Sequence, residues 1–262
     1  MWAYLAGIWR CRYFWLMLVK NDLRQRYRRS VLGLGWSLLQ PIAMTCIICF
    51  VFQAILMQGE NVAQFAAHVL AGLACWNYIL SSTLNGCYCL YVGETYIRQY
   101  PAPMAIYPLR VALGGAFHFL IAVTVVLLLC WVINGFANLW VLPFLLVGVL
   151  IFFIVTWSLA VLAGFANVYF QDTQHLCEVG FQILFYMTPI IYPESLLRGQ
   201  HLSWVADCNP VRALIDLVRK PILYGELPSM PTFVMATLTT AVLATAASYT
   251  LARLQKRLIF SL

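Results

Sequence analysis

Charged residues are scarce in this sequence. Aspartate, glutamate, lysine and arginine make up 10% of the 262 residues, whereas 63% are hydrophobic. Soluble globular domains carry about 25% charged and about 45–50% apolar residues. A water-soluble fold could not bury this much apolar surface. The composition therefore predicts an all-α integral membrane protein, most of which has the lipid bilayer as its solvent.

Sequence patterns typical of enzymes are absent as well. No phosphate-binding loop of the form GxxxxGK[ST] occurs, so ATP and Mg²⁺ would bind to a separate chain if ATP drives transport. No nucleophile elbow and no His-rich metal pattern occurs, and no pair of acidic residues falls inside a hydrophobic stretch. These absences argue against an enzyme, against a cofactor in this chain and against a proton-coupled transporter.

The nine cysteines invite a metal or a disulfide interpretation. Most of them lie in apolar stretches, where a free cysteine behaves as a small hydrophobic residue. Cys46 and Cys49 share a helix face, but no histidine or carboxylate stands near them in the sequence. Only Cys208 falls in a long outward loop, which leaves it without an obvious disulfide partner. We therefore expect no metal site.

Uncharged stretches predict about six transmembrane helices, since a helix needs about 20 apolar residues to cross a hydrocarbon core of about 30 Å. The fifth stretch is too short for an ordinary crossing and ends at Pro189 and Pro193. We expect it to be re-entrant or broken, and to line a path, because irregular backbone at membrane depth needs cover from protein or water. Residues 31–262 thus form one transmembrane domain, with spans at about 34–58, 64–91, 106–133, 141–169, 176–193 and 232–252.

The basic residues predict the orientation. With the N-terminus inside, twelve of the 16 lysines and arginines fall on the cytoplasmic side. This bias places both termini in the cytoplasm and explains the basic surplus without nucleic acid. Residues 1–30 have no signal-peptide cleavage site and are expected to form a helix in the cytoplasmic membrane interface, although a simple topology anchor is the alternative. The residues expected at the lipid headgroups are Arg24, Arg26, Arg28 and Arg29.

Three segments are more specific. Residues 26–41 read RYRRSVLGLGWSLLQP, residues 172–175 read DTQH with FYMTPIIYP following at 185–193, and residues 209–216 read NPVRALID. Together they resemble the permease subunit of the type-2 class of ABC exporters for polysaccharide. That class serves lipopolysaccharide O-antigen and teichoic acid, with capsule exporters as near relatives. The resemblance covers nearly the whole chain, and departs from the family where Gln171 replaces the usual basic residue before Asp172.

This resemblance implies a homodimer of permeases, bound to two ABC ATPase subunits, in a bacterial inner membrane. A lipid-linked glycan would pass from the cytoplasm outward through a channel at the dimer interface. Contact with the ATPase would involve a cytoplasmic helix at residues 93–101, between spans two and three, and the stretch before the fifth span. The implied coupling residues are Glu94, Arg98, Tyr100, Asp172 and His175.

Aromatic and hydroxyl residues repeat in the fifth stretch. Phe181, Phe185, Thr188 and Tyr192 follow the spacing i, i+4, i+7 and i+11, which is one face of a helix. A sugar ring has apolar C–H faces that stack on aromatic rings and hydroxyls that need partners, so this face suits a sliding glycan. With Trp36, these residues are the candidates for the substrate path. Ordinary packing between helices is the alternative.

A short amphipathic helix is expected to begin at Asn209 and Pro210, a cap followed by proline at the first helical position. Its apolar face would hold Val211, Leu214, Ile215 and Val218. Arg212 and Asp216 would pair at i, i+4 on the opposite face. On the outer surface such a helix is a candidate gate, formed by Asn209, Arg212 and Asp216, or a passive cover.

The sequence thus favours the permease of an ATP-driven exporter of lipid-linked polysaccharide. Only the motif resemblance and the aromatic face argue against an exporter of a drug, a peptide or a lipid. A membrane-embedded glycosyltransferase or acyltransferase would need a catalytic carboxylate or histidine at a membrane edge. Glu94, Asp172 and His175 are available for that role but match no catalytic spacing.

Overall fold

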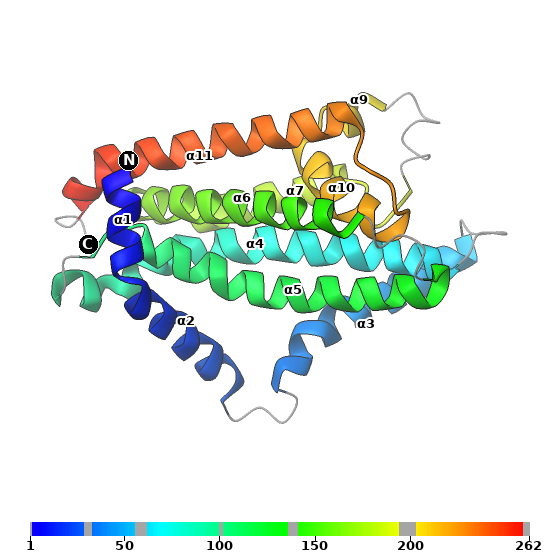
Figure 1. Cartoon of the computed structure of the whole chain (residues 1–262), viewed down its shortest axis with the longest axis horizontal. Coiled ribbons are helices and arrows are strands. Elements are labelled where there is room, and N and C mark those ends of the chain that lie inside the picture. Colours follow the sequence, from blue (N-terminus) through cyan, green and yellow to red (C-terminus); the bar gives the residue numbers. More distant parts are fainter. Residues whose placement is uncertain are drawn as a thin grey trace.

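The computed structural model describes residues 2–28, 33–55, 62–99, 102–135, 141–193 and 203–258. Every regular element in these ranges is helical, and the long helices lie along one bundle axis (Figure 1). A 3₁₀ turn at Gly33–Gly35 precedes α3. The α-helices are α1 (Trp2–Arg10), α2 (Arg12–Tyr27), α3 (Trp36–Ile55), α4 (Val62–Gln99), α5 (Ile106–Asn134), α6 (Leu142–Tyr169), α7 (Thr173–Met187), α9 (Ser203–Asp207), α10 (Pro210–Leu223) and α11 (Met230–Leu258).

The predicted all-α membrane class is confirmed. Helices α4, α5, α6 and α11 are long and apolar enough to cross a bilayer, and α3 has a shorter apolar stretch at Trp36–Val51. Helix α7 has 15 residues, which at 1.5 Å per residue is about 22 Å and too short for the hydrocarbon core. The α1 and α11 ends of the chain lie at one end of the bundle (Figure 1), called here the terminus end; the opposite end is called the far end.

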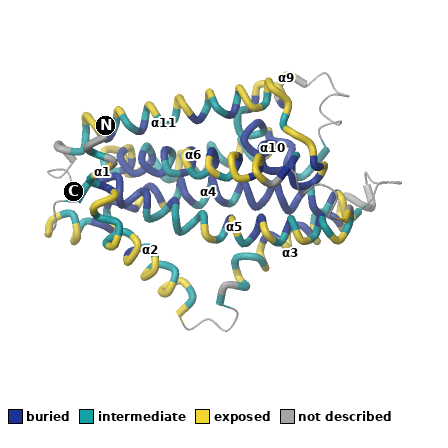
Figure 2. The backbone as a smooth tube through the Cα atoms, viewed as in Figure 1, coloured by how far each residue is buried: buried dark blue, intermediate teal, exposed yellow. Residues whose placement is uncertain are grey.

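Helix α4 is the centre of the bundle. It packs against α3, α5, α6, α7 and α10, and Figure 2 shows it buried along much of its length. In its most apolar stretch 67% of the residues are buried, whereas in α11 the figure is 17%. Helix α11 therefore presents most of its apolar surface outward, as a lipid-facing span does.

Small residues allow α4 and α6 to approach closely. A Cβ atom on Gly86 of α4 would lie 2.7 Å from the Cα atom of Ala160 in α6. A Cβ atom on Gly164 of α6 would lie 2.8 Å from the carbonyl oxygen of Gly86. Helices in a bilayer associate through such close packing, because burying apolar surface between them gains little over lipid contact. The central pair of spans is thus specified by glycine and alanine.

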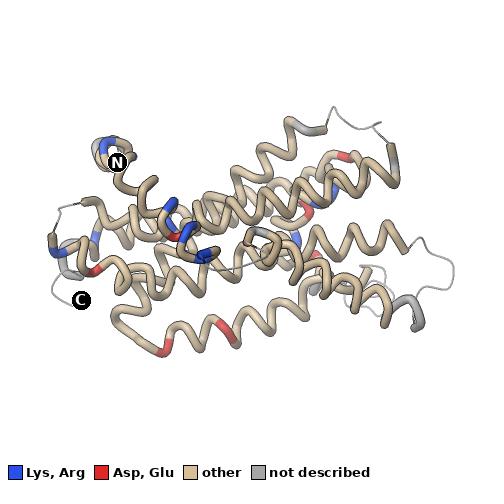
Figure 3. Tube along the Cα trace, turned by 90° about the horizontal axis from the view of Figure 1, so that it is seen from below, with Lys and Arg blue, Asp and Glu red and all other residues tan. Residues whose placement is uncertain are grey.

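Charged side chains are unevenly distributed along the bundle. In Figure 3 the lysines and arginines lie mostly in the half that contains the two termini, and a second group of basic and acidic residues lies toward the far end. The first group agrees with the cytoplasmic orientation predicted for both termini. The orientation itself stays a prediction.

The N-terminal segment forms two helices, where the sequence predicted one. The chain turns at Cys11, between α1 and α2. Trp9 and Tyr13 are 65% and 73% exposed, and the guanidinium of Arg12 lies 5.8 Å and 4.7 Å from the centres of their rings. Exposed aromatic rings beside cations suit a membrane interface. The predicted headgroup residues Arg24, Arg26 and Arg28 are exposed, and Arg29 lies outside the described residues.

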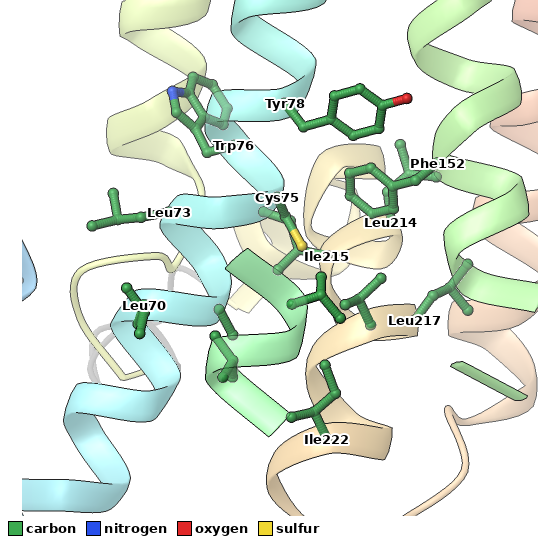
Figure 4. Close-up of a cluster of buried hydrophobic side chains, with 14 of the residues drawn as sticks. Leu70, Leu73, Cys75, Trp76, Tyr78, Phe152, Leu214, Ile215, Leu217 and Ile222 are labelled. Carbon is green, nitrogen blue, oxygen red and sulfur yellow. The ribbon is translucent and has the colours of Figure 1, made fainter. Parts of the chain in front are cut away.

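Helix α10 is buried inside the bundle, so it does not lie on a surface as an interfacial helix would; its place on the outer side of the membrane stays a prediction. Figure 4 shows its apolar side chains meeting those of α4 and α6 in one cluster, and all residues from 213 to 219 are buried. A Cβ atom on Gly148 of α6 would lie 2.9 Å from the carbonyl oxygen of Leu217, so this glycine lets α10 pack against α6. The predicted apolar face is correct, since Leu214, Ile215 and Val218 belong to this core.

Candidate functional site

Helix α7 ends at Met187 because Pro189 follows two residues later. Proline disfavours the helical conformation in the residue before it, and Thr188 has φ −99° and ψ 129°, which is extended backbone. Thr188 and Tyr192 therefore lie in the turn after α7 rather than on a continued helix. The predicted face from Phe181 to Tyr192 is wrong beyond Phe185, and the broken fifth segment is confirmed.

The two phenylalanines of that face point toward α4. The ring of Trp76, itself 4% exposed, lies 5.7 Å from the ring of Phe181 and 5.3 Å from that of Phe185, measured between centroids. Edge-to-face and tilted contacts at these distances stabilise aromatic pairs. Within one chain both rings thus pack on α4, while Trp36 of α3 remains 53% exposed. Their role in a path stays a prediction.

The opposite face of α7 is open. No residue of α7 is buried, and large apolar side chains on it are 56–71% exposed: Leu176, Val179, Ile183 and Tyr186. Tyr192 folds back from the turn toward this helix, donating its hydroxyl hydrogen to the carbonyl oxygen of Tyr186 at 2.8 Å. Helix α7 is therefore attached to the bundle along one side only.

Asn209 joins the candidate path to the candidate gate. Its side-chain oxygen accepts hydrogen bonds from the backbone N–H groups of Val211 and Arg212 at 2.9 and 3.2 Å, which caps α10 as predicted. Its side-chain amide donates to the hydroxyl of Thr188 at 2.9 Å and to the carbonyl oxygen of Met187 at 3.3 Å. The start of α10 is thus held against the end of α7.

The charged residues of α10 form a compact group at the far end. Arg212 lies 3.1 Å from Asp207 and 3.6 Å from Asp216. Arg219 lies 4.0 Å from Asp216 and donates a hydrogen bond to the carbonyl oxygen of Pro189 at 3.0 Å. Arg219 is 4% exposed and was not among the predicted site residues. Its position three residues after Asp216 could have placed it on the same helix face.

The long N-terminal motif converges on a histidine that sequence reasoning missed. Tyr27 near the start of the motif and Ser37 near its end are 2.8 Å apart, measured between hydroxyl oxygens. Both lie within hydrogen-bond distance of Nδ1 of His118 in α5, at 3.0 and 3.1 Å. The adjacent ion pair between Asp22 and Arg110 also joins α2 to α5. The motif therefore fixes the interfacial helix and the first span to the third.

A polar cavity of about 280 Å³ lies beside this junction, between α2, α4 and α5. Ser81, Asn85 and Tyr88 of α4 line it, together with Arg26 of α2 and Arg110 of α5. A polar strip thus runs along α4 toward the terminus end, on a span where apolar side chains would be expected.

The predicted coupling residues lie in two neighbouring segments. Glu94 and Arg98 form an ion pair at 2.9 Å with 37% and 61% of their side chains exposed. They occupy the last turns of α4, so the predicted separate helix at 93–101 is wrong, because α4 continues without a break to Gln99. Tyr100 lies outside the described residues. The second span was predicted to end at about residue 91, and α4 extends eight residues past that point.

The second coupling segment is the start of α7. Asp172 and His175 are both exposed, and Nδ1 of His175 lies 3.4 Å from a carboxylate oxygen of Glu178. The hydroxyl of Tyr88 on α4 donates a hydrogen bond to the side-chain oxygen of Gln174. This contact places the start of α7 beside α4.

These features define a multi-pass membrane protein with a broken span held against a buried, charged helix. The model of the ABC-2 type transporter family matches residues 13–223. The chain belongs to the ABC-2 type transporter family. Membership of this family indicates a transport permease.

Similar proteins are O-antigen export permeases. Two proteins of Klebsiella pneumoniae, each named O-antigen export system permease protein RfbA, are 25% identical to this chain over 215 residues, covering 81% of this chain and 81% of the relative. A protein of the same name from Myxococcus xanthus is 24% identical over 234 residues and covers 89% of both chains. The predicted resemblance to polysaccharide export permeases is confirmed.

Proposed function

We propose that this chain is the membrane-spanning subunit of an ATP-driven exporter that moves a lipid-linked, O-antigen-like polysaccharide from the cytoplasm to the outer face of a bacterial inner membrane. Two copies of the chain form the transporting unit, with two copies of a separate ABC ATPase at the terminus end. Both termini lie in the cytoplasm. ATP and Mg²⁺ bind only to the partner ATPase.

The observation that carries this proposal is the agreement with the O-antigen export permeases along 81–89% of the chain. The match to the family model at residues 13–223 includes the N-terminal motif, the broken fifth segment and α10 together. The polar strip on α4 supports a hydrophilic cargo, because polar groups in a membrane span are retained for pathways and sites. Tyr88 on this strip is exposed, and an exposed aromatic ring suits the apolar face of a sugar ring.

In this proposal the path is bordered by the fifth segment, with Trp36, Phe181, Phe185, Thr188 and Tyr192 in its wall. Asn209, Arg212 and Asp216 form the outer gate through their attachment to the turn after α7. Glu94, Arg98, Tyr100, Asp172 and His175 transmit the movement of the ATPase. Because α7 is attached on one side only, a shift of this helix against the bundle breaks few contacts and costs little free energy.

The test is deletion of the gene in its own bacterium, followed by complementation. Loss of the permease should remove the glycan from the cell surface and cause its lipid-linked form to accumulate inside. Surface glycan is measured by lectin or antibody binding, and the intracellular form by mass spectrometry of extracted lipids. Unchanged surface glycan together with altered efflux of a drug or lipid would contradict the proposal and favour an exporter of another cargo.

A second test concerns the separation of transport from ATP hydrolysis. The purified permease should show no ATPase activity above background until its partner ATPase is added, because the chain contains no phosphate-binding loop. A permease preparation that hydrolyses ATP, and keeps doing so after a second purification step that removes any ATPase, would contradict the assignment of ATP binding to the partner.

A further inference from the structure

A second cavity lies at the far end of the bundle and has a different character. It measures about 450 Å³ and lies between the first turns of α4, the end of α5, α10 and the turn after α7. Among the described side chains, three cations line it, Arg212, Arg219 and Lys220, together with one carboxylate, that of Asp216. Such a concentration of cations inside a membrane protein is costly and requires a compensating partner.

Two described carboxylates, those of Asp216 and Asp207, lie within ion-pair distance of these cations. Asp216 lies 3.6 Å from Arg212 and 4.0 Å from Arg219, which are long distances for an ion pair shared by two guanidinium groups. Asp207 pairs with Arg212 at 3.1 Å but is 53% exposed. Even when both carboxylates are counted, the described side chains leave one positive charge in excess.

Arg219 also has unused hydrogen-bonding capacity. Its Nη1 group donates to Pro189, but its Nε and Nη2 atoms are buried and have no hydrogen-bond partner within the described part of the chain. The same is true of Nε2 of His68, which lines the same cavity. A buried polar group without a partner costs about 1–3 kcal/mol, and more if it is charged. The single chain is therefore incompletely satisfied at this point.

Gly72 of α4 leaves room for the guanidinium group of Arg219. A Cβ atom on Gly72 would lie 2.5 Å from Nη2 of Arg219 and 3.0 Å from a side-chain carbon of Ile190. Any larger residue at this position would therefore displace Arg219 or the turn after α7. The absence of a side chain at Gly72 keeps the cation beside the cavity.

We propose that this cavity binds a phosphate-type anion. Arginine presents paired N–H donors that match phosphate oxygens, and lysine adds a mobile charge. Phe65, Leu223 and Tyr224 supply an apolar part of the lining, so the cavity fits a phosphoester with an apolar or sugar substituent better than free phosphate. A phospholipid headgroup and the phosphate that joins a glycan to its lipid carrier share this chemistry. This inference about anion binding does not depend on the proposed transport function.

The test uses the full-length permease in nanodiscs of phosphatidylcholine, which has no net charge. One arm titrates inorganic pyrophosphate and follows thermal unfolding. The other replaces part of the lipid with phosphatidylglycerol and counts the lipids retained in native mass spectrometry.

The variants are Lys220→Gln and the double variant Arg212→Gln with Lys220→Gln. Lys220 is only half-buried, so its replacement should fold. The matched control is Arg253→Gln, which removes an exposed cation of α11.

We expect saturable stabilisation by pyrophosphate, with an affinity that falls roughly tenfold or more in the double variant, the loss that removing one or two charge-assisted hydrogen bonds produces. The Arg253→Gln control should bind as the unchanged protein does. Retention of phosphatidylglycerol without a response to pyrophosphate would identify a lipid headgroup as the ligand. A response to neither probe, or equal losses in the control, would overturn the proposal.

Discussion

Helices α7 and α10 are similar in length, with 15 and 14 residues, but the fold exposes the first and buries the second. Helix α7 carries one charged residue, Glu178, and has no buried residue. Helix α10 carries four charged residues and is buried from Ala213 to Arg219. In a bilayer apolar surface is stable against lipid, so it does not drive burial, whereas polar groups must find partners inside. A prediction from hydrophobicity alone would therefore place the wrong one of these two short helices in the core.

The strongest test of this contrast removes the buried cation of α10. Arg219→Leu leaves Asp216 with a weaker partner and the carbonyl oxygen of Pro189 without its donor, so we expect a loss of about 3 kcal/mol in the free energy of unfolding. The measurement is chemical unfolding in mixed micelles. Arg253→Leu is the control, since Arg253 lies 5.6 Å from the ring of Tyr249 at an exposed position and should cost less than about 1 kcal/mol. Equal losses would show that the buried charges of α10 do not stabilise the fold.

The next test compares the two faces of α7. Phe185→Ala removes the ring that packs on Trp76, and we expect a loss of about 1–3 kcal/mol, below the value for a fully buried phenylalanine. Ile183→Ala, at a position 56% exposed, should cost less than about 1 kcal/mol. The readout is unfolding together with glycan export. Export that falls more than the amount of folded Phe185→Ala protein supports a path role, and export that only follows it indicates packing.

A smaller effect is expected where the two helices meet. Asn209→Ala removes the cap of α10 and its bonds to Thr188 and Met187, and should cost about 1–2 kcal/mol. Asn209→Ser keeps a capping hydroxyl but cannot reach both partners, so it should lose about half as much. Thermal unfolding compares the two. If the serine variant is as unstable as the alanine variant, the attachment to α7 matters more than the cap.

The smallest effect on stability, and the largest on coupling, is expected at the end of α4. An exposed i, i+4 ion pair contributes about 0.3–0.5 kcal/mol, so the double variant Glu94→Ala with Arg98→Ala should insert and fold normally. Glycan export by the complex should nevertheless fall sharply, because the pair lies where the ATPase is proposed to act. Lys20→Ala is the control for loss of an exposed cation. Normal export by the double variant would remove this segment from the coupling role.

Local features of the fold were predictable from the sequence. The all-α membrane class, the short and broken fifth segment, and the start of α10 at Asn209 depend on hydropathy, proline and capping, which act over a few residues. The helical face through Tyr192 was wrong for the same local reason, since Pro189 ends α7 earlier than the aromatic spacing indicated. The separate helix expected at residues 93–101 was wrong because nothing between Gly93 and Gln99 interrupts α4.

The amino-acid sequence by itself determined that this is an all-α membrane protein, that its fifth segment is short and broken, and which family motifs it carries. Only the tertiary structure decided that Arg219 lies inside the bundle, that Phe181 and Phe185 face Trp76, and that Tyr27 meets His118 from 91 residues away. The physical reason is that an apolar face is equally stable against lipid and against protein. Which faces meet depends instead on small residues and on polar groups from distant helices that satisfy one another.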